Sequence, residues 1–157
     1  MRLKSIIYED YSNYRRPALF LGTCLCDWKC ERESKDCHCQ NSSFANYPIV
    51  DVDDAKLVDD YMGNSLTHAI VVGGLEPMLQ FPELIRLIDT FRKRTDDPIV
   101  IYTGYYEDEI ANKIKLLRKH RNIILKVGRY IPNDKPHLDE VLGVELASSN
   151  QRGIRLS

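Results

Sequence analysis

The stretch Ala18-Leu-Phe-Leu-Gly-Thr-Cys-Leu-Cys-Asp-Trp-Lys-Cys30 begins as an apolar run and ends among cysteines. Residues 18–21 are a short apolar segment of the kind that forms a buried strand. All five cysteines of the chain lie from Cys24 to Cys39, directly after this segment. Thiolates so close in sequence are typical of an iron–sulfur cluster or a zinc site, because both need several sulfur ligands around one point. We therefore expect the strand to lead into a metal-binding loop over residues 22–48.

Composition limits the class of protein. The length of 157 residues fits a single domain over residues 1–157. A net charge of −1, with acidic and basic residues interspersed, leaves no basic stripe for nucleic acid and no long apolar or polybasic segment for a membrane. The first ten residues carry charges within a short apolar run, unlike a secretory signal. We expect a cytoplasmic protein, and in that reducing compartment close cysteines indicate metal binding rather than disulfides.

The chain alternates apolar strands with amphipathic helices. Strands are expected at residues 3–8, 18–21, 69–72, 98–102, 123–125 and 141–147. Helices are expected at residues 55–62, 82–94 and 107–121. Such alternation implies βαβ units. We therefore predict an α/β fold, an open or partial (βα) barrel with a mainly parallel sheet of about five strands, and functional loops at the carboxyl ends of these strands.

Three further motifs fall at or after expected strands. Gly73-Gly-Leu-Glu-Pro77 follows one strand, Tyr102-Thr-Gly104 ends the next, and Ser148-Ser-Asn-Gln-Arg152 follows the last. Each motif alone is compatible with an ordinary turn or helix cap, because Gly, Ser and Asn are common turn residues. They indicate a function only in combination with the cysteine cluster.

Together these segments resemble a known enzyme family. Cys26-Asp-Trp-Lys-Cys30 resembles the opening Cys-x3-Cys of the radical S-adenosylmethionine enzymes, and Cys39-Gln-Asn41 resembles the third ligand in one branch of that family. The segment 73–77 is similar to the Gly-Gly-Glu-Pro motif of the family, and segments 102–105 and 148–152 are similar to a strand end and a C-terminal signature of the same branch. In this order, the motifs resemble the activating proteins of anaerobic (class III) ribonucleotide reductases.

The resemblance implies a cofactor chemistry. Cys26, Cys30 and Cys39 would hold a 4Fe-4S cluster and leave one iron open to the amino and carboxylate groups of S-adenosylmethionine. An electron from a flavodoxin- or ferredoxin-type reductant would cleave the sulfonium and give a 5′-deoxyadenosyl radical. That radical would abstract hydrogen from a glycine of the partner, the glycyl radical protein that is the catalytic subunit of the reductase. The resemblance assigns cofactor binding to five residues: Gly73, Gly74, Glu76, Thr103 and Asn150. It assigns no catalytic side chain.

Two departures from the family pattern leave alternatives open. Eight residues separate Cys30 from Cys39, and Leu75 is inserted into the Gly-Gly-Glu motif. Cys39 is preferred to Cys37 as the third ligand only because Gln-Asn follows it. Other possibilities are a radical enzyme with another substrate and a non-catalytic iron–sulfur electron carrier. A zinc-binding module is a further possibility, with four ligands drawn from the five cysteines and His38, although cysteine spacings of one and three residues match zinc knuckle pairs poorly.

Overall fold

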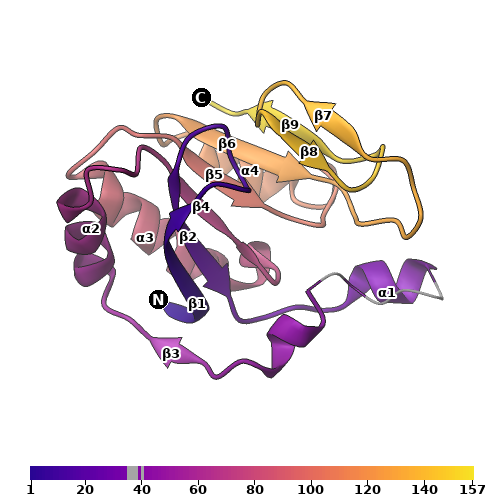
Figure 1. Ribbon diagram of the computed structural model, residues 1–157, viewed down its shortest axis with the longest axis horizontal. Helices are drawn as coiled ribbons and strands as arrows, with labels where there is room; N and C mark the ends of the chain where they lie inside the picture. The colour runs from indigo at the N-terminus through magenta and orange to yellow at the C-terminus, as the bar shows by residue number, and fades with distance from the viewer. Residues whose placement is uncertain (35–38, 40) are drawn as a thin grey trace.

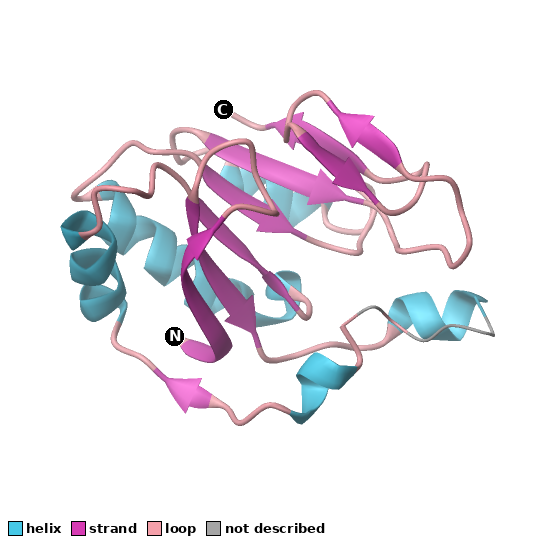
Figure 2. Cartoon of the chain, in the orientation of Figure 1, coloured by secondary structure: helices cyan, strands magenta, loops and turns pink. Residues whose placement is uncertain are grey.

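The computed structural model of the protein describes residues 1–34, 39 and 41–157. In these residues nine strands form two sheets (Figures 1 and 2). The strands are β1 Arg2–Asp10, β2 Ala18–Thr23, β3 Val50–Asp51, β4 Ile70–Gly74, β5 Ile99–Tyr102, β6 Ile123–Val127, β7 His137–Asp139, β8 Val144–Leu146 and β9 Arg152–Arg155. The α-helices are α1 Lys29–Ser34, α2 Asp54–Gly63, α3 Phe81–Arg92 and α4 Ala111–Leu117, with short 3-10 helices η1 Ser43–Asn46 and η2 Pro77–Gln80. No helix of the described residues is long and apolar enough to cross a membrane.

The main sheet is parallel at its centre and antiparallel at both borders. Its order over the described residues is β3-β1-β2-β4-β5-β6-β9. The pairs β2–β4, β4–β5 and β5–β6 are parallel, whereas β1–β2, β1–β3 and β6–β9 are antiparallel. The remaining strands, β7 and β8, form a separate antiparallel hairpin.

The predicted (βα) barrel with a mainly parallel sheet is therefore wrong. The structure has an open mixed sheet of seven strands, and its four described helices do not surround it. Only residues 11–17 connect β1 to β2, which is too few for the crossover that parallel strands need. At the other border, the chain returns from β6 through the β7–β8 hairpin and enters β9 antiparallel.

The central elements lie where their apolar patterns place them. The strands expected at 18–21, 69–72, 98–102 and 123–125 are confirmed as β2, β4, β5 and β6. The three expected helices are confirmed as α2, α3 and α4, although α4 begins only at Ala111. The strand expected at 141–147 is shorter and belongs to the hairpin as β8. The last strand of the main sheet is β9, which the prediction missed.

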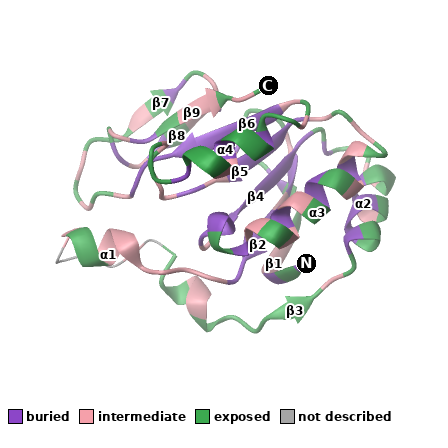
Figure 3. Ribbon diagram, turned by 180° about the vertical axis from the view of Figure 1, so that it is seen from behind, coloured by how far each residue is buried: buried purple, intermediate pink, exposed green. Residues whose placement is uncertain are grey.

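Two cores lie on opposite faces of the main sheet. Helices α2, α3 and α4 bury their apolar faces against one side, where alternate residues of β4, β5 and β6 meet them. Figure 3 shows this arrangement, with buried strands behind helices whose outer sides are exposed. A smaller core lies on the other face, where Tyr14, Leu142 and Leu146 cover Val71, Val100 and Ile124. The second face is thus covered by loop and hairpin residues rather than by helices.

The helix-side core generates a stability prediction. Phe91 of α3 is fully buried, and its ring meets the ring of Tyr61 edge-on with centroids 5.6 Å apart. Phe91→Ala should lower the free energy of unfolding by about 3–5 kcal/mol, because the vacated volume cannot collapse completely. Urea denaturation followed by circular dichroism measures this change.

The control is Leu116→Ala, which truncates a side chain that is 44% exposed on α4. This control should change the free energy of unfolding by no more than about 0.5 kcal/mol. Equal losses for the two variants would contradict the assignment of this core.

Candidate metal centre

The loops after β2, β4, β5 and β6 meet at one edge of the main sheet, because these adjacent strands run parallel. They border a cavity of about 370 Å³. Aromatic side chains of Phe20 and Tyr102 lie on its sheet side, and residues of β8 and of the β1–β2 connection complete its lining. The cavity therefore lies on the face opposite α2, α3 and α4.

Three of the cysteines line this cavity: Cys26, Cys30 and Cys39. Burial raises the pKa of the Cys26 thiol to about 11. A hydrogen bond with Cys39, together with burial, raises the pKa of the Cys30 thiol. The metal-free thiols of Cys26 and Cys30 are therefore held protonated at neutral pH, and metal binding must displace their protons.

Of the other two cysteines, only Cys24 lies among the described residues. Cys24 is buried but is not among the cavity residues; its backbone N–H donates to Gln80 Oε1 at 2.6 Å. Cys37 and His38, which were considered as alternative ligands, lie outside the described residues. The choice between Cys37 and Cys39 as a ligand therefore stays a prediction.

The donors around the cavity fit an iron–sulfur cluster. Backbone N–H groups donate to two of the sulfurs, from Trp28 to Cys26 Sγ at 3.3 Å and from Asn41 to Cys39 Sγ at 3.4 Å. Such N–H···S bonds stabilise thiolates and adjust cluster potentials. Among the described residues, no three His, Cys, Asp or Glu side chains are gathered around a single-ion position. A four-iron cluster does not require that arrangement, because each thiolate binds a different iron.

The glycine pair at the end of β4 packs against the C-terminal part of the cysteine loop. Gly74 has a φ of +84°, which favours glycine, and a Cβ there would lie 2.8 Å from Cε1 of Phe44. The Asn41 side chain donates to the Gly74 carbonyl at 2.7 Å. A Cβ on Gly73 would lie 3.2 Å from the ring of Phe20. The absence of side chains at the two glycines therefore permits close packing of the loop and of the aromatic floor.

Glu76 connects three of the loops. Its carboxylate is buried and accepts hydrogen bonds from the backbone N–H of Met78 at 2.9 Å, from the Thr103 hydroxyl at 2.8 Å and from the Gly104 N–H at 2.9 Å. Its own N–H donates to the carbonyl of Leu25 at 2.7 Å. Burial raises the pKa of Glu76, while the three donors act in the opposite direction. Despite the inserted Leu75, Glu76 and Thr103 both reach the cavity.

Sequence reasoning missed Lys126. It lines the cavity from β6 and is only 7% exposed, with its Nζ donating to the Gly128 carbonyl at 3.0 Å. Burial lowers the pKa of Lys126 to about 8. A lysine within the apolar run Ile-Ile-Leu-Lys-Val was the available signal, because a strand interior rarely holds a cation without a partner or ligand. A buried cation that faces a cavity is suited to bind an anionic group of a ligand.

Asn150 lies beside the cavity rather than in its lining. Its side-chain amide donates to the Tyr106 hydroxyl and to the Arg129 carbonyl, both at 3.0 Å. Its Oδ1 is buried and has no hydrogen-bond donor in the part of the chain that the structure describes. The neighbouring Gln151 does line the cavity. The structure thus brings Gly74, Glu76 and Thr103 together with the cysteines; the binding role of these residues, and of Gly73 and Asn150, stays a prediction.

The cysteine positions give a direct test of the metal ligands. Cys26→Ala, Cys30→Ala and Cys39→Ala should each reduce bound iron and sulfide to background after anaerobic reconstitution, because each removes one ligand. Cys24→Ala is the matched control and should retain the cluster, since Cys24 lies away from the cavity. Metal analysis and visible absorbance measure the outcome. Cluster loss in Cys37→Ala with retention in Cys39→Ala would overturn the choice of third ligand.

Comparison with known proteins bears on the same region. A family model described as a 4Fe-4S single cluster domain matches residues 18–153, which run from the start of β2 into β9 and include the loops after β2, β4, β5 and β6 that border the cavity. No curated protein and no solved structure matches the chain significantly. The family match covers most of the chain and agrees with three thiols at one cavity. The protein therefore belongs to the 4Fe-4S single cluster domain family.

Proposed function

We propose that this protein cleaves S-adenosylmethionine reductively and that the resulting 5′-deoxyadenosyl radical generates a glycyl radical on the catalytic subunit of an anaerobic ribonucleotide reductase. The cluster would supply one electron and an open iron for the ligand. The observation that carries the proposal is a cavity of about 370 Å³ lined by three cysteines and two buried groups of opposite charge. The motif resemblance supplies the reaction class and the partner.

The described cavity thiols support this chemistry. Of the four cysteines that the structure describes, Cys26, Cys30 and Cys39 line the cavity, whereas Cys24 does not. Three thiolates satisfy three irons of a four-iron cluster and leave one position for a ligand from the cavity. A cluster that only carries electrons ordinarily has four protein thiolates and needs no cavity of this size, whereas ligand sites occupy about 300–1,000 Å³. The cavity therefore favours catalysis over electron transfer alone.

The charges in the cavity complement the methionine portion of the ligand. Lys126 is cationic and buried on β6, and the carboxylate of Glu76 is buried after β4. A zwitterionic amino acid presents one carboxylate and one ammonium, which would pair with Lys126 and Glu76 respectively. The faces of Phe20 and Tyr102 would offer an apolar surface for the adenosine. In this arrangement the chain's own residues orient the ligand, and the bond cleavage belongs to the cofactor.

The role of Lys126 can be tested by binding. Lys126→Met keeps most of the side-chain volume but removes the charge, and it should weaken S-adenosylmethionine binding at least about tenfold, because hydrogen bonds to charged groups contribute about 1.5–3 kcal/mol. Equilibrium dialysis with the cluster-loaded protein gives the dissociation constant. The control is Lys115→Met, on the exposed side of α4. Unchanged affinity in Lys126→Met would remove this residue from the binding site.

The reaction itself is tested in two steps with reconstituted protein under anaerobic conditions. With S-adenosylmethionine and dithionite we expect 5′-deoxyadenosine from the wild type and none from Cys30→Ala. With the reductase catalytic subunit present, we expect the glycyl radical signal by electron paramagnetic resonance. 5′-Deoxyadenosine without a glycyl radical would indicate a radical enzyme with another substrate. No 5′-deoxyadenosine from protein with a full cluster would contradict the proposal and favour an electron carrier.

A further inference from the structure

Helix α1 carries Cys30 but has no buried side chain. It is a short helix, of a length that is not stable in isolation. Figure 1 shows it at the opposite end of the molecule from α2, beyond the edge of the main sheet. Burial of apolar surface therefore cannot account for its position, and its polar contacts must do so.

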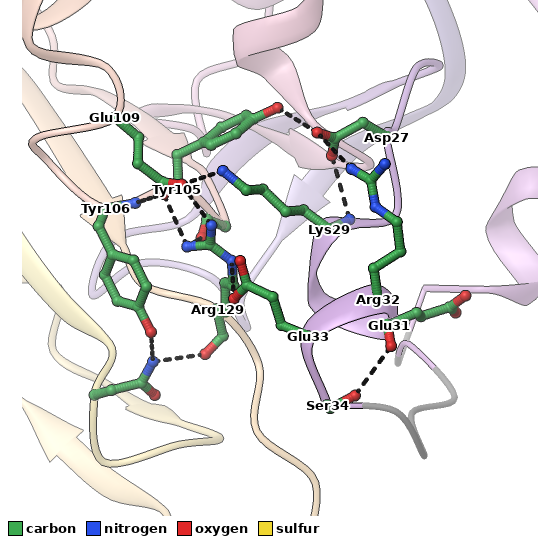
Figure 4. Close-up of polar contacts among 12 residues, drawn as sticks. Asp27, Lys29, Glu31, Arg32, Glu33, Ser34, Tyr105, Tyr106, Glu109 and Arg129 are labelled. Atoms are coloured by element: carbon green, nitrogen blue, oxygen red, sulfur yellow. Dashed lines mark hydrogen bonds and ion pairs between the residues drawn. The ribbon is translucent and has the colours of Figure 1, made fainter.

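Charged and polar contacts connect α1 and its approach to the loops after β5 and β6 (Figure 4). Lys29 pairs with Glu109, and its Nζ lies 5.2 Å from the centre of the Tyr105 ring. The Tyr105 hydroxyl donates to Asp27 at 2.7 Å. On the last turn of α1, Glu33 lies 2.8 Å from Nε of Arg129. The contacts thus hold the segment on both sides of Cys30.

Arg129 is the centre of this network. Its side chain is only 5% exposed and binds both oxygens of Glu109, at 2.8 and 2.6 Å. Its guanidinium lies 4.6 Å from the centre of the Tyr106 ring. The side-chain amide of Asn150 donates hydrogen bonds to both the Arg129 carbonyl and the Tyr106 hydroxyl. These contacts therefore fix the position of Arg129 independently of its contact with Glu33.

We propose that Arg129, oriented by Glu109, is a positioning residue that clamps α1 through Glu33 and thereby fixes the Cys30 thiol at the metal centre and limits access to the cluster. The clamp acts through helix position, and Arg129 is not among the residues that line the large cavity. It rests on the assignment of Cys30 as a cluster ligand and not on S-adenosylmethionine cleavage. Its tests therefore need no turnover, and a failure of the proposed reaction leaves them unaffected.

The first experiment measures how well the cluster is protected. Arg129→Gln should release iron to an external chelator at least about tenfold faster than the wild type, because removing one partner leaves charges of the network unpaired. Glu33→Gln is a milder change at a half-exposed position and should accelerate release by about two- to fivefold. The control is Arg121→Gln, which removes the exposed pair with Asp96 at 2.8 Å and should leave the rate unchanged.

The second experiment separates positioning from general stability. Trp28 is the single tryptophan of the chain and stands two residues before Cys30, so its fluorescence reports the segment that carries the ligand. Iodide should quench Trp28 more strongly in metal-free Arg129→Gln and Glu33→Gln than in the wild type or Arg121→Gln. The double variant should equal Arg129→Gln in both experiments, because the two single changes remove the same contact.

These outcomes decide the proposal. Unchanged iron release and unchanged Trp28 quenching in Glu33→Gln would overturn it, and this surface variant remains informative if Arg129→Gln does not fold. Additive effects in the double variant would also overturn it, because they would show that Glu33 and Arg129 act separately. A lower urea midpoint for Arg129→Gln with wild-type quenching and iron release would assign Arg129 to fold stability alone.

Discussion

The metal centre depends on the adjacency of four parallel strands. β2, β4, β5 and β6 are hydrogen-bonded neighbours, so the loops at their carboxyl ends must lie side by side. This constraint places the cysteine loop next to the Gly-Gly turn, and the Gly-Gly turn next to Thr103. Glu76 then joins the three loops through its carboxylate and its backbone N–H. The antiparallel borders extend the sheet without disturbing this edge.

The parts of the fold that local sequence could predict are those with strong apolar patterns. β4, β5 and β6 are buried on both faces, so their apolar runs, interrupted in β6 only by Lys126, indicate buried strands. β9 reads Arg-Gly-Ile-Arg and borders the sheet, where little burial imposes a pattern. Strand direction is not encoded in the alternation of helices and strands, and this is why a barrel was predicted where the sheet is mixed. The short β1–β2 connection was the available signal against a parallel pair.

Some residues of the candidate site could likewise be predicted from the sequence, and others could not. Cysteines, glycines and Glu76 stand in contiguous motifs, and a motif can be read without knowing the fold. Lys126 belongs to the cavity because alternate residues of β6 face opposite sides of the sheet, so its role depends on which side holds the cavity. Arg129 and Glu109 are 20 residues apart, and Glu33 is far from both along the chain. Contacts of this kind arise only when tertiary structure brings the loops together.

Ionic contacts that position α1 have a physical advantage over apolar contacts. Breaking an apolar contact exposes hydrophobic surface to water. Glu33 is half exposed, so water can solvate its carboxylate when the contact with Arg129 breaks. Arg129 retains the bidentate pair with Glu109, and its buried charge is compensated in both arrangements. The asymmetry of the two carboxylates therefore means that breaking the Glu33 contact leaves no unpaired buried charge at Arg129.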